Sequence, residues 1–495
     1  MTQPQAQAEV THEAHVTVRN ISAVLLLRIA QYPFLVLSML LIPRMMGPHA
    51  YGDYALIQSI LVMAASVTEL GLGEICGRFV PDFDLLGDRR PLQRFAGGFL
   101  ATKLALTAVL SGPLFLFLWT IYGDRFPATY FILVIATLFV LAVGAVPYGL
   151  MFGLNRLNLF AMRIPLRRAL TLILVLVLYH YFGLVGAIAS IPLVEGILTA
   201  MNLVWGRQFI RLRDCRVDYA FLKPYLKFGF AFYLSTGVTT VWQKIGNPMI
   251  AYLTGDSREV ALFDIPNQIF LITTAFLLVT IGYLVPIFVR LLATGKEEKL
   301  VVWSSLILKY VFALSVLIVG GFVIAGRELM PVLIGREYSA IYPNTAVLVM
   351  GFFPMLVVQL GYVFCVVYKQ ARIYLYALIC AVIVFVPAAF VLIPRLASMG
   401  ASLATVFSTV VAAVVLSVVF WSRVAPCLRE GAPVVALGIV FVPFWFLRQG
   451  LVVDLVLGVI AGLIYIAALL LTRKLRIEEI TEVLRAVRLR PKMAE

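Results

Sequence analysis

The chain alternates between long apolar stretches and short polar breaks from Ile21 to Leu471. Each apolar stretch runs for about twenty residues, the length that an α-helix needs to cross a hydrocarbon layer about 30 Å thick. The breaks are rich in Gly, Pro, Lys and Arg. The pattern therefore predicts an all-α polytopic membrane protein with about 14 transmembrane helices.

We expect the spans at residues 21–43, 53–75, 97–121, 128–152, 158–182, 184–206, 228–252, 261–287, 301–325, 341–367, 372–393, 399–421, 432–448 and 451–471. The last two stretches are short and are separated only by residues 448–450. The alternative for this pair is therefore a single hairpin.

Composition agrees with this pattern, because 62% of the residues are hydrophobic and only 13% are charged. A soluble domain carries about 25% charged residues. The net charge of +15 comes from 40 Lys and Arg residues, most of which fall in the N-terminal tail, the even-numbered loops and the C-terminal tail. Such a bias predicts that both termini are cytoplasmic. The membrane in which we expect this multi-pass protein is the cell inner (plasma) membrane. A nucleic-acid partner is disfavoured, since the basic residues are scattered over many loops.

The sequence offers no pattern for a metal, a cofactor or a disulfide framework. None of its five cysteines lies in a CxxC pair or at a ligand spacing. Residues 1–20 are polar and lead into a full-length span, which predicts no cleavable signal peptide. The short loops leave no room for a soluble catalytic domain, so we expect no enzyme activity.

A weak internal repeat recurs after about 205–210 residues. The Gly-containing turn at residues 46–54 matches 254–263, and the turn at 182–187 matches 397–404. The repeat predicts two six-helix lobes of the same orientation plus two C-terminal helices, a plan common among transporters. The expected parts are a tail (1–20), an N-lobe (21–210), a C-lobe (211–425), two extra spans (426–472) and a basic tail (473–495). We expect the last tail to be an amphipathic helix on anionic lipid.

Four segments carry a family resemblance. They are IPRMMGPHAYGDY at residues 42–54, ELGLGE at 69–74, LIGREY at 333–338 and LIPR at 392–395. Together they resemble landmarks of the bacterial polysaccharide-biosynthesis flippases, the O-antigen and exopolysaccharide repeat-unit translocases of the multidrug/oligosaccharidyl-lipid/polysaccharide exporter superfamily. The resemblance covers roughly residues 20 to 425.

The resemblance implies a flippase that moves an undecaprenyl-diphosphate-linked oligosaccharide from the cytoplasmic to the outer leaflet by alternating access. The implied partners are this lipid-linked oligosaccharide, membrane lipids, and a polysaccharide polymerase and glycosyltransferases. The alternatives are a cation-coupled multidrug or small-molecule exporter of the same superfamily, a membrane-embedded polymerase or ligase, and a non-transporting scaffold. Many relatives carry an acidic residue where this chain has Gly246, so a coupling role for that carboxylate does not carry over.

Polar residues inside membrane helices are costly and usually face a water-filled cavity. The clearest polar stripe lies on the seventh span, where side chains recur at i, i+3 and i+4 spacing. Spans 1, 2, 7 and 8 line the central cavity in the family that this chain resembles. We therefore expect the substrate cavity to be lined by Arg28, Gln31, Thr240, Gln243, Lys244, Asn247 and Asn267.

Arg28 and Lys244 lie at different depths and are candidates to bind the diphosphate of the cargo, Arg bidentately and Lys as a point charge. The alternative for each is that it extends toward the nearer membrane interface. Three carboxylates, Glu69, Glu195 and Asp264, are candidates for ion coupling or gating. The alternative for Glu69 and Asp264 is a structural role at a helix end. For Glu195 the alternatives are a protonated acid and a structural hydrogen bond between helices.

Overall fold

The computed structural model describes residues 3–85, 89–210, 215–282 and 285–475. All regular elements in these residues are helices, which confirms the predicted all-α class. Nine of the described helices are long and apolar enough to cross a membrane, or ten if the bent pair α11 (Ile341–Met350) and α12 (Phe352–Val367) counts as one span. Two of the nine are double-length helices that bend at a glycine. The expected number of about fourteen spans is therefore roughly matched.

These double-length helices are α1 (Gln3–Val67) and α5 (Leu157–Gly206). Gly47 inside α1 has a φ of 74°, and Gly183 inside α5 has a φ of 60°. A positive φ is readily adopted only by glycine, and here it turns the chain back within a continuous run of helix. Both bends fall in turns expected from the sequence. Because α1 begins at Gln3, the segment expected to be a polar tail continues the first helix.

The chain divides into two compact units. Unit 1 comprises Met1–Asp264 and Ile393–Ser398, and unit 2 comprises Ile265–Leu392 and Met399–Glu495. In addition to α1 and α5, unit 1 holds α2 (Leu72–Leu85), α3 (Arg89–Tyr122), α4 (Ala128–Gly153), α6 (Tyr219–Lys244), α7 (Gly246–Thr254) and the start of α8 (Ser257–Gly282). Helices α6 and α7 pack on α1 although they follow residue 210. The lobes expected from the repeat stay a prediction.

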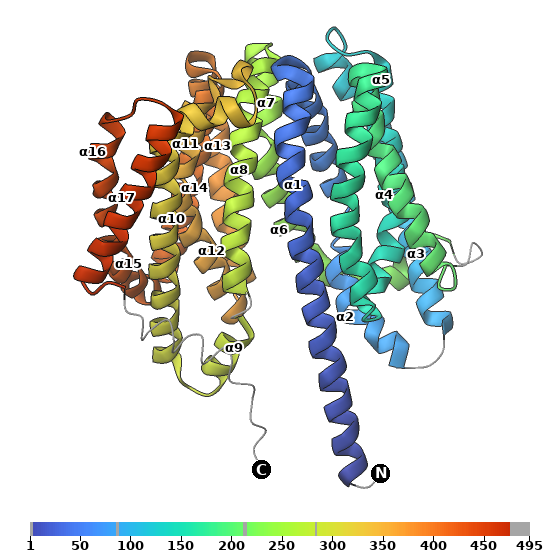
Figure 1. The fold of residues 1–495 in the computed structure, drawn as a ribbon. Helices are drawn as coiled ribbons and strands as arrows, with labels where there is room; N and C mark the ends of the chain where they lie inside the picture. The colour runs from blue at the N-terminus through green and yellow to red at the C-terminus, as the bar shows by residue number, and fades with distance from the viewer. Residues whose placement is uncertain (1–2, 86–88, 211–214, 283–284, 476–495) are drawn as a thin grey trace. The chain divides into compact units, whose positions relative to one another are not determined.

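In unit 1, α1 runs beside α5, and α4 packs between α5 and α3 (Figure 1). The apolar core lies where α2, α3, α4 and α6 meet. Its fully buried members include Ile75, Phe95, Phe99, Val146 and Leu222. These side chains come from helices far apart in the sequence, so their burial fixes how the helices pack.

Helix α6 begins at a charged cap. The Asp218 carboxylate accepts a hydrogen bond from the Phe221 amide over 3.1 Å and pairs with the Arg94 guanidinium. Both contacts hold the pKa of Asp218 below its ordinary value of 3.8, and the hydrogen bond from Arg94 has the larger effect. The carboxylate is therefore ionised at neutral pH, as a helix N-terminus favours.

Unit 2 is built around α10 (Glu297–Leu333), which packs on α15 (Trp421–Ala436) and α17 (Leu451–Leu471) (Figure 1). In addition to α11, α12 and most of α8, its other elements are α9 (Val285–Ala293), η2 (Arg336–Tyr338), most of α13 (Ala371–Leu396), nearly all of α14 (Ser398–Val419), η3 (Leu437–Val440) and α16 (Phe441–Phe446). The Arg423 guanidinium pairs with Glu297 over 2.8 Å and so ties α15 to the start of α10. Residues 476–495, most of the predicted basic tail, lie outside the described residues.

The packing of α1 on the start of α8 depends on the absence of a side chain at Gly52. A Cβ atom there would lie 1.8 Å from the Ser257 carbonyl oxygen, which is backbone and has no rotamer to change. We predict that Gly52→Ala lowers stability by about 1–3 kcal/mol, the usual cost of overpacking. The measurement is the melting temperature of the purified protein in detergent.

The matched control is Gly73→Ala in α2, where an added Cβ meets no atom within 4 Å. Alanine is a better helix former than glycine by about 1 kcal/mol, so this change should be neutral or stabilising. An equal melting temperature for both variants would show that α1 and α8 do not approach closely at Gly52.

Candidate substrate-binding site

A buried hydrogen-bond network joins α1, α7 and α8 within unit 1. The Asn247 amide nitrogen donates to Ser59 Oγ and to Asp264 Oδ1, each over 2.7 Å. The Tyr51 hydroxyl donates to the other oxygen of Asp264 over 2.9 Å. All four residues are buried, so these bonds offset the cost of removing polar groups from water.

The local sequence explains why Asn247 reaches this position. Pro248 follows it and has no amide hydrogen, so the Lys244 carbonyl loses its usual helical partner and α6 ends there. The hydrogen bond to Asp264 fixes the orientation of the Asn247 amide, since a carboxylate accepts hydrogen bonds and the amide nitrogen must therefore face it. Asn247 Oδ1 is then left buried and, among the described residues, without a hydrogen-bond partner. This oxygen can accept a hydrogen bond from a water molecule or from a hydroxyl group.

Gly246 packs directly on α8. A Cβ atom at this position would lie 2.5 Å from the Phe263 ring. A carboxylate side chain therefore does not fit at position 246, where the resemblance led us to expect an acidic residue in many relatives. The nearby buried carboxylate in unit 1 is instead Asp264, in the network just described.

The remaining members of the polar stripe on α6 lie one or two turns before Asn247. Thr240, Gln243 and Lys244 are half-buried. The Thr240 hydroxyl donates back to the Thr236 carbonyl over 2.8 Å, which satisfies its hydrogen within the helix. No ion pair among the described residues involves Lys244.

The other expected cavity residues lie on α1 and α8, and Glu69, a candidate for coupling or gating, lies between α1 and α2. Gln31 is half-buried on α1, and the side chain of Arg28 lies outside the described residues. Asn267 is buried on the part of α8 that belongs to unit 2. Glu69 is exposed in the turn between α1 and α2. The central cavity between two lobes stays a prediction, as do the roles of these residues.

Glu195 lies at the centre of a buried ion cluster. Its carboxylate pairs with Arg163 over 2.9 Å and with Arg167 over 2.6 Å. Arg163 also covers the Tyr148 ring, with 4.3 Å between guanidinium carbon and ring centroid. The Glu195 side chain is 2% exposed and that of Arg167 is 52% exposed, so the pair links a buried carboxylate to an accessible cation.

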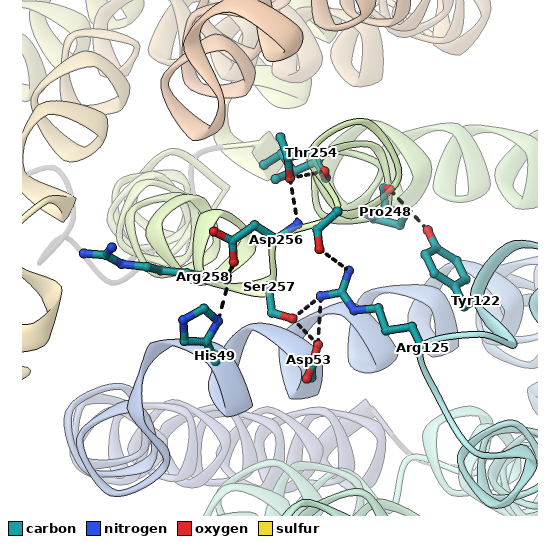
Figure 2. Close-up of polar contacts among 11 residues, drawn as sticks. His49, Asp53, Tyr122, Arg125, Pro248, Thr254, Asp256, Ser257 and Arg258 are labelled. Atoms are coloured by element: carbon teal, nitrogen blue, oxygen red, sulfur yellow. Dashed lines mark hydrogen bonds and ion pairs between the residues drawn. The ribbon is translucent and has the colours of Figure 1, made fainter.

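A second polar cluster, around Arg125, gathers at the Gly47 bend of α1, the α3–α4 connection and the α7–α8 turn, as Figure 2 shows. The Arg125 guanidinium donates to Asp53 over 3.0 Å and also to the Ser257 hydroxyl. His49 lies 3.5 Å from Asp256, and the Tyr122 hydroxyl donates to the Pro248 carbonyl over 3.2 Å. These contacts fasten the three segments together at one end of unit 1.

A cavity of about 560 Å³ in unit 1 lies away from these clusters. Its lining includes Arg89, Arg156, Trp205 and Gln208 and is otherwise mostly apolar, and none of the predicted cavity residues borders it. No group of three or more His, Cys, Asp or Glu side chains in the described part of the chain could hold a metal ion.

Sequence reasoning missed the cations that face Glu195 and the Arg125 cluster. A signal existed for the first set, because Arg163 and Arg167 have i, i+4 spacing and so share one helix face. Counted from the bend at Gly183, Arg167 and Glu195 lie at comparable depths on the two arms of α5. No local sequence pattern marks Arg125, which lies in the connection between α3 and α4 and binds Asp53 from there.

Residues 17–292 match the family model described as polysaccharide biosynthesis protein. This chain belongs to that family. The match spans more than half of the sequence and includes all of the polar clusters described above. No curated protein matches the sequence.

Solved structures show how the family fold relates to known transporters. The lipid II flippase MurJ in its inward closed conformation matches with a TM-score of 0.68 at 10% identity, over 91% of this chain and 99% of that one. An inward-facing multidrug resistance MATE family transporter of the MOP superfamily matches with a TM-score of 0.65 at 15% identity, over 81% and 96%. The Vibrio cholerae MATE transporter VcmN in the bent form gives 0.52 at 14% identity, over 83% and 98%. The family member described here therefore has a MurJ- and MATE-like fold.

The ion cluster yields a test of what Glu195 does. Glu195→Gln keeps the shape of the side chain but leaves two guanidinium groups without their carboxylate. We predict a loss of about 3 kcal/mol of stability, at the lower end for a broken buried pair because Arg167 is half exposed. Denaturant unfolding of the purified protein in detergent measures it.

Glu74→Gln in α2 is the matched control, because Glu74 is exposed. It should leave stability within about 0.5 kcal/mol of the wild type. Unchanged stability of Glu195→Gln together with lost transport would contradict a structural role and assign Glu195 to ion coupling.

Proposed function

We propose that this protein is a flippase that moves an undecaprenyl-diphosphate-linked oligosaccharide from the cytoplasmic to the outer leaflet of the cell inner membrane. The observation that carries the proposal is Lys244, a half-buried cation on the polar face of α6, three residues before the buried Asn247. A cation in a membrane helix needs an opposite charge, and the diphosphate supplies one. The family match and the MurJ-like fold support a lipid-linked cargo.

The proposed division of labour follows the chemistry of the cargo. The polyprenyl tail stays in lipid, while the diphosphate meets Lys244 and Arg28. The sugar meets hydrogen-bonding groups, of which Gln31, Thr240, Gln243, Asn267 and the open acceptor of Asn247 are the candidates. Both termini are proposed to be cytoplasmic, where the glycosyltransferases that build the cargo work. A polymerase would use the glycan on the other side.

We assign Asp264 to gating. Its carboxylate receives hydrogen bonds from α1 and α7 at once, through Tyr51 and Asn247. A change in the charge or position of one side chain would thus alter how three helices are held. Glu69 is exposed and is proposed only as a helix-end residue.

A cation-coupled exporter of small molecules is the second candidate, and the likeness to MATE transporters supports it. A cationic drug needs an acidic or aromatic pocket. The charged member of the α6 stripe is the cation Lys244, which favours an anionic cargo.

Substitutions of Lys244 test the proposed cargo. Lys244→Ala should reduce export of the glycan at least about tenfold, since a charge-assisted bond to the diphosphate is lost. Lys244→Arg should keep part of the export, because the charge stays while reach and geometry change. Lys244→Glu should be worse than Lys244→Ala, since repulsion is added. Surface glycan is measured in cells with matched amounts of membrane-inserted protein.

The matched control is Lys227→Ala, which removes an exposed lysine from the same helix. It should export as the wild type does. Wild-type export by both Lys244→Ala and Arg28→Ala, at matched protein levels, would rule out the diphosphate contact and leave extension to the interface as the account of both cations.

A further inference from the structure

A cavity of about 620 Å³ opens in unit 2 between α10, α15 and the end of α17. Its volume lies in the range of known ligand sites. Four basic side chains and one carboxylate line it: Lys309, Arg429, Arg473, Lys474 and Glu430. Its remaining wall is mostly apolar, with Val301, Val302 and Leu306 from α10 and Pro426 from α15.

The helical repeat places these groups together. Val301, Ser305 and Lys309 follow one another at i, i+4 spacing and so form one stripe on α10. Ser305 Oγ lies 3.3 Å from Cys427 Sγ, which fastens this stripe to α15. On α15, Pro426 and Arg429 share a face by their i, i+3 spacing. Two packed helices, α10 and α15, therefore form most of the cavity wall.

The end of α17 supplies the other two cations. Arg473 has a φ of 53°, and its amide donates to the Leu470 carbonyl over 3.0 Å. This left-handed residue turns the chain so that both Arg473 and Lys474 border the cavity. Basic residues at a helix C-terminus also complement the helix dipole. That effect accounts for these two side chains but not for Lys309 and Arg429, which come from other helices.

Lys309 is the most informative member. It is only 4% exposed, and its ammonium lies 5.1 Å from the centroid of the Tyr310 ring. Lys309 shares the cavity wall with three further cations and with only one carboxylate, Glu430. A cavity with this lining carries a net positive charge, which favours an anionic occupant.

We propose that this cavity binds the headgroup of an anionic phospholipid, with the phosphate among Lys309, Arg429, Arg473 and Lys474. The adjoining apolar wall suits the first part of an acyl chain, and Val302 in it is 56% exposed. A soluble phosphate would contact the cations but not the apolar wall. An acidic peptide would also leave the apolar wall without an apolar group to pack on it. Basic pockets between membrane helices are known to hold anionic headgroups.

The test measures lipid binding to the full-length protein in detergent by native mass spectrometry, with phosphatidylglycerol and phosphatidylcholine as probes. We expect a clear preference for phosphatidylglycerol. The triple variant Arg429→Gln, Arg473→Gln and Lys474→Gln should weaken phosphatidylglycerol binding about tenfold or more. The control variant Lys299→Gln, Lys369→Gln and Arg372→Gln removes three exposed cations of unit 2 outside the cavity and should bind as the wild type does.

Lys309→Met provides a second variant that keeps the length of the side chain. It should weaken phosphatidylglycerol binding at an unchanged melting temperature, which separates loss of the site from loss of the fold. Equal binding of the two lipids, or equal weakening in the cavity and control variants, would overturn the proposal. Displacement of the lipid by inorganic phosphate would assign a soluble anion instead, and preferred binding of a polyglutamate peptide would assign a protein partner. The readout is independent of transport.

Discussion

A charge inside a hydrocarbon layer has to be compensated, and this requirement organises the polar residues of unit 1. Glu195 is compensated within the protein, because two guanidinium groups of the same bent helix meet its carboxylate. Asp264 is compensated by hydrogen bonds from Tyr51 and Asn247. Lys244, among the described residues, has no such ion pair. In our account the compensating charge comes from the diphosphate of the cargo.

The family landmark at residues 42–54 is explained by the packing and hydrogen bonds of its residues. Gly47 turns α1, and Gly52 lets α1 approach the start of α8 closely. Tyr51 bonds Asp264, and Asp53 bonds Arg125 and Ser257. The landmark is therefore not a binding motif in itself. It fastens the bend of α1 to the α3–α4 connection and the α7–α8 turn, which sets the geometry around Asn247.

Much of this architecture could be predicted from the sequence, because membrane helices are read from length and hydropathy alone. The turns at Gly47, Gly183 and Gly255 were expected, since each places a glycine between apolar runs. In the structure, each of these glycines has a positive φ. The turn before α14 was expected as well. There, the residue with positive φ is Ala397 rather than Gly400, because neighbouring helices can impose a backbone that local preference disfavours.

The candidate site could be predicted only in part. Helical spacing identified a polar face that includes Lys244 and Asn247, but spacing does not reveal which residues oppose that face. Ser59 and Asp264 come to Asn247 through the packing of α1, α7 and α8. The partners of Glu195 were missed for the same reason, since they depend on the register of two helix arms across a bend.

The central claim is that the protein carries a lipid-linked oligosaccharide across a bilayer. The most direct measurement reconstitutes the purified protein in vesicles that contain undecaprenyl-diphosphate-linked oligosaccharide. A glycan-cleaving enzyme added outside then reports how much cargo is in the outer leaflet. The account predicts that cargo from the inner leaflet becomes accessible much faster than in protein-free vesicles, and that vesicles with Lys244→Ala behave like protein-free ones. Equal accessibility with and without the wild-type protein, in vesicles shown to contain it folded, would contradict the account.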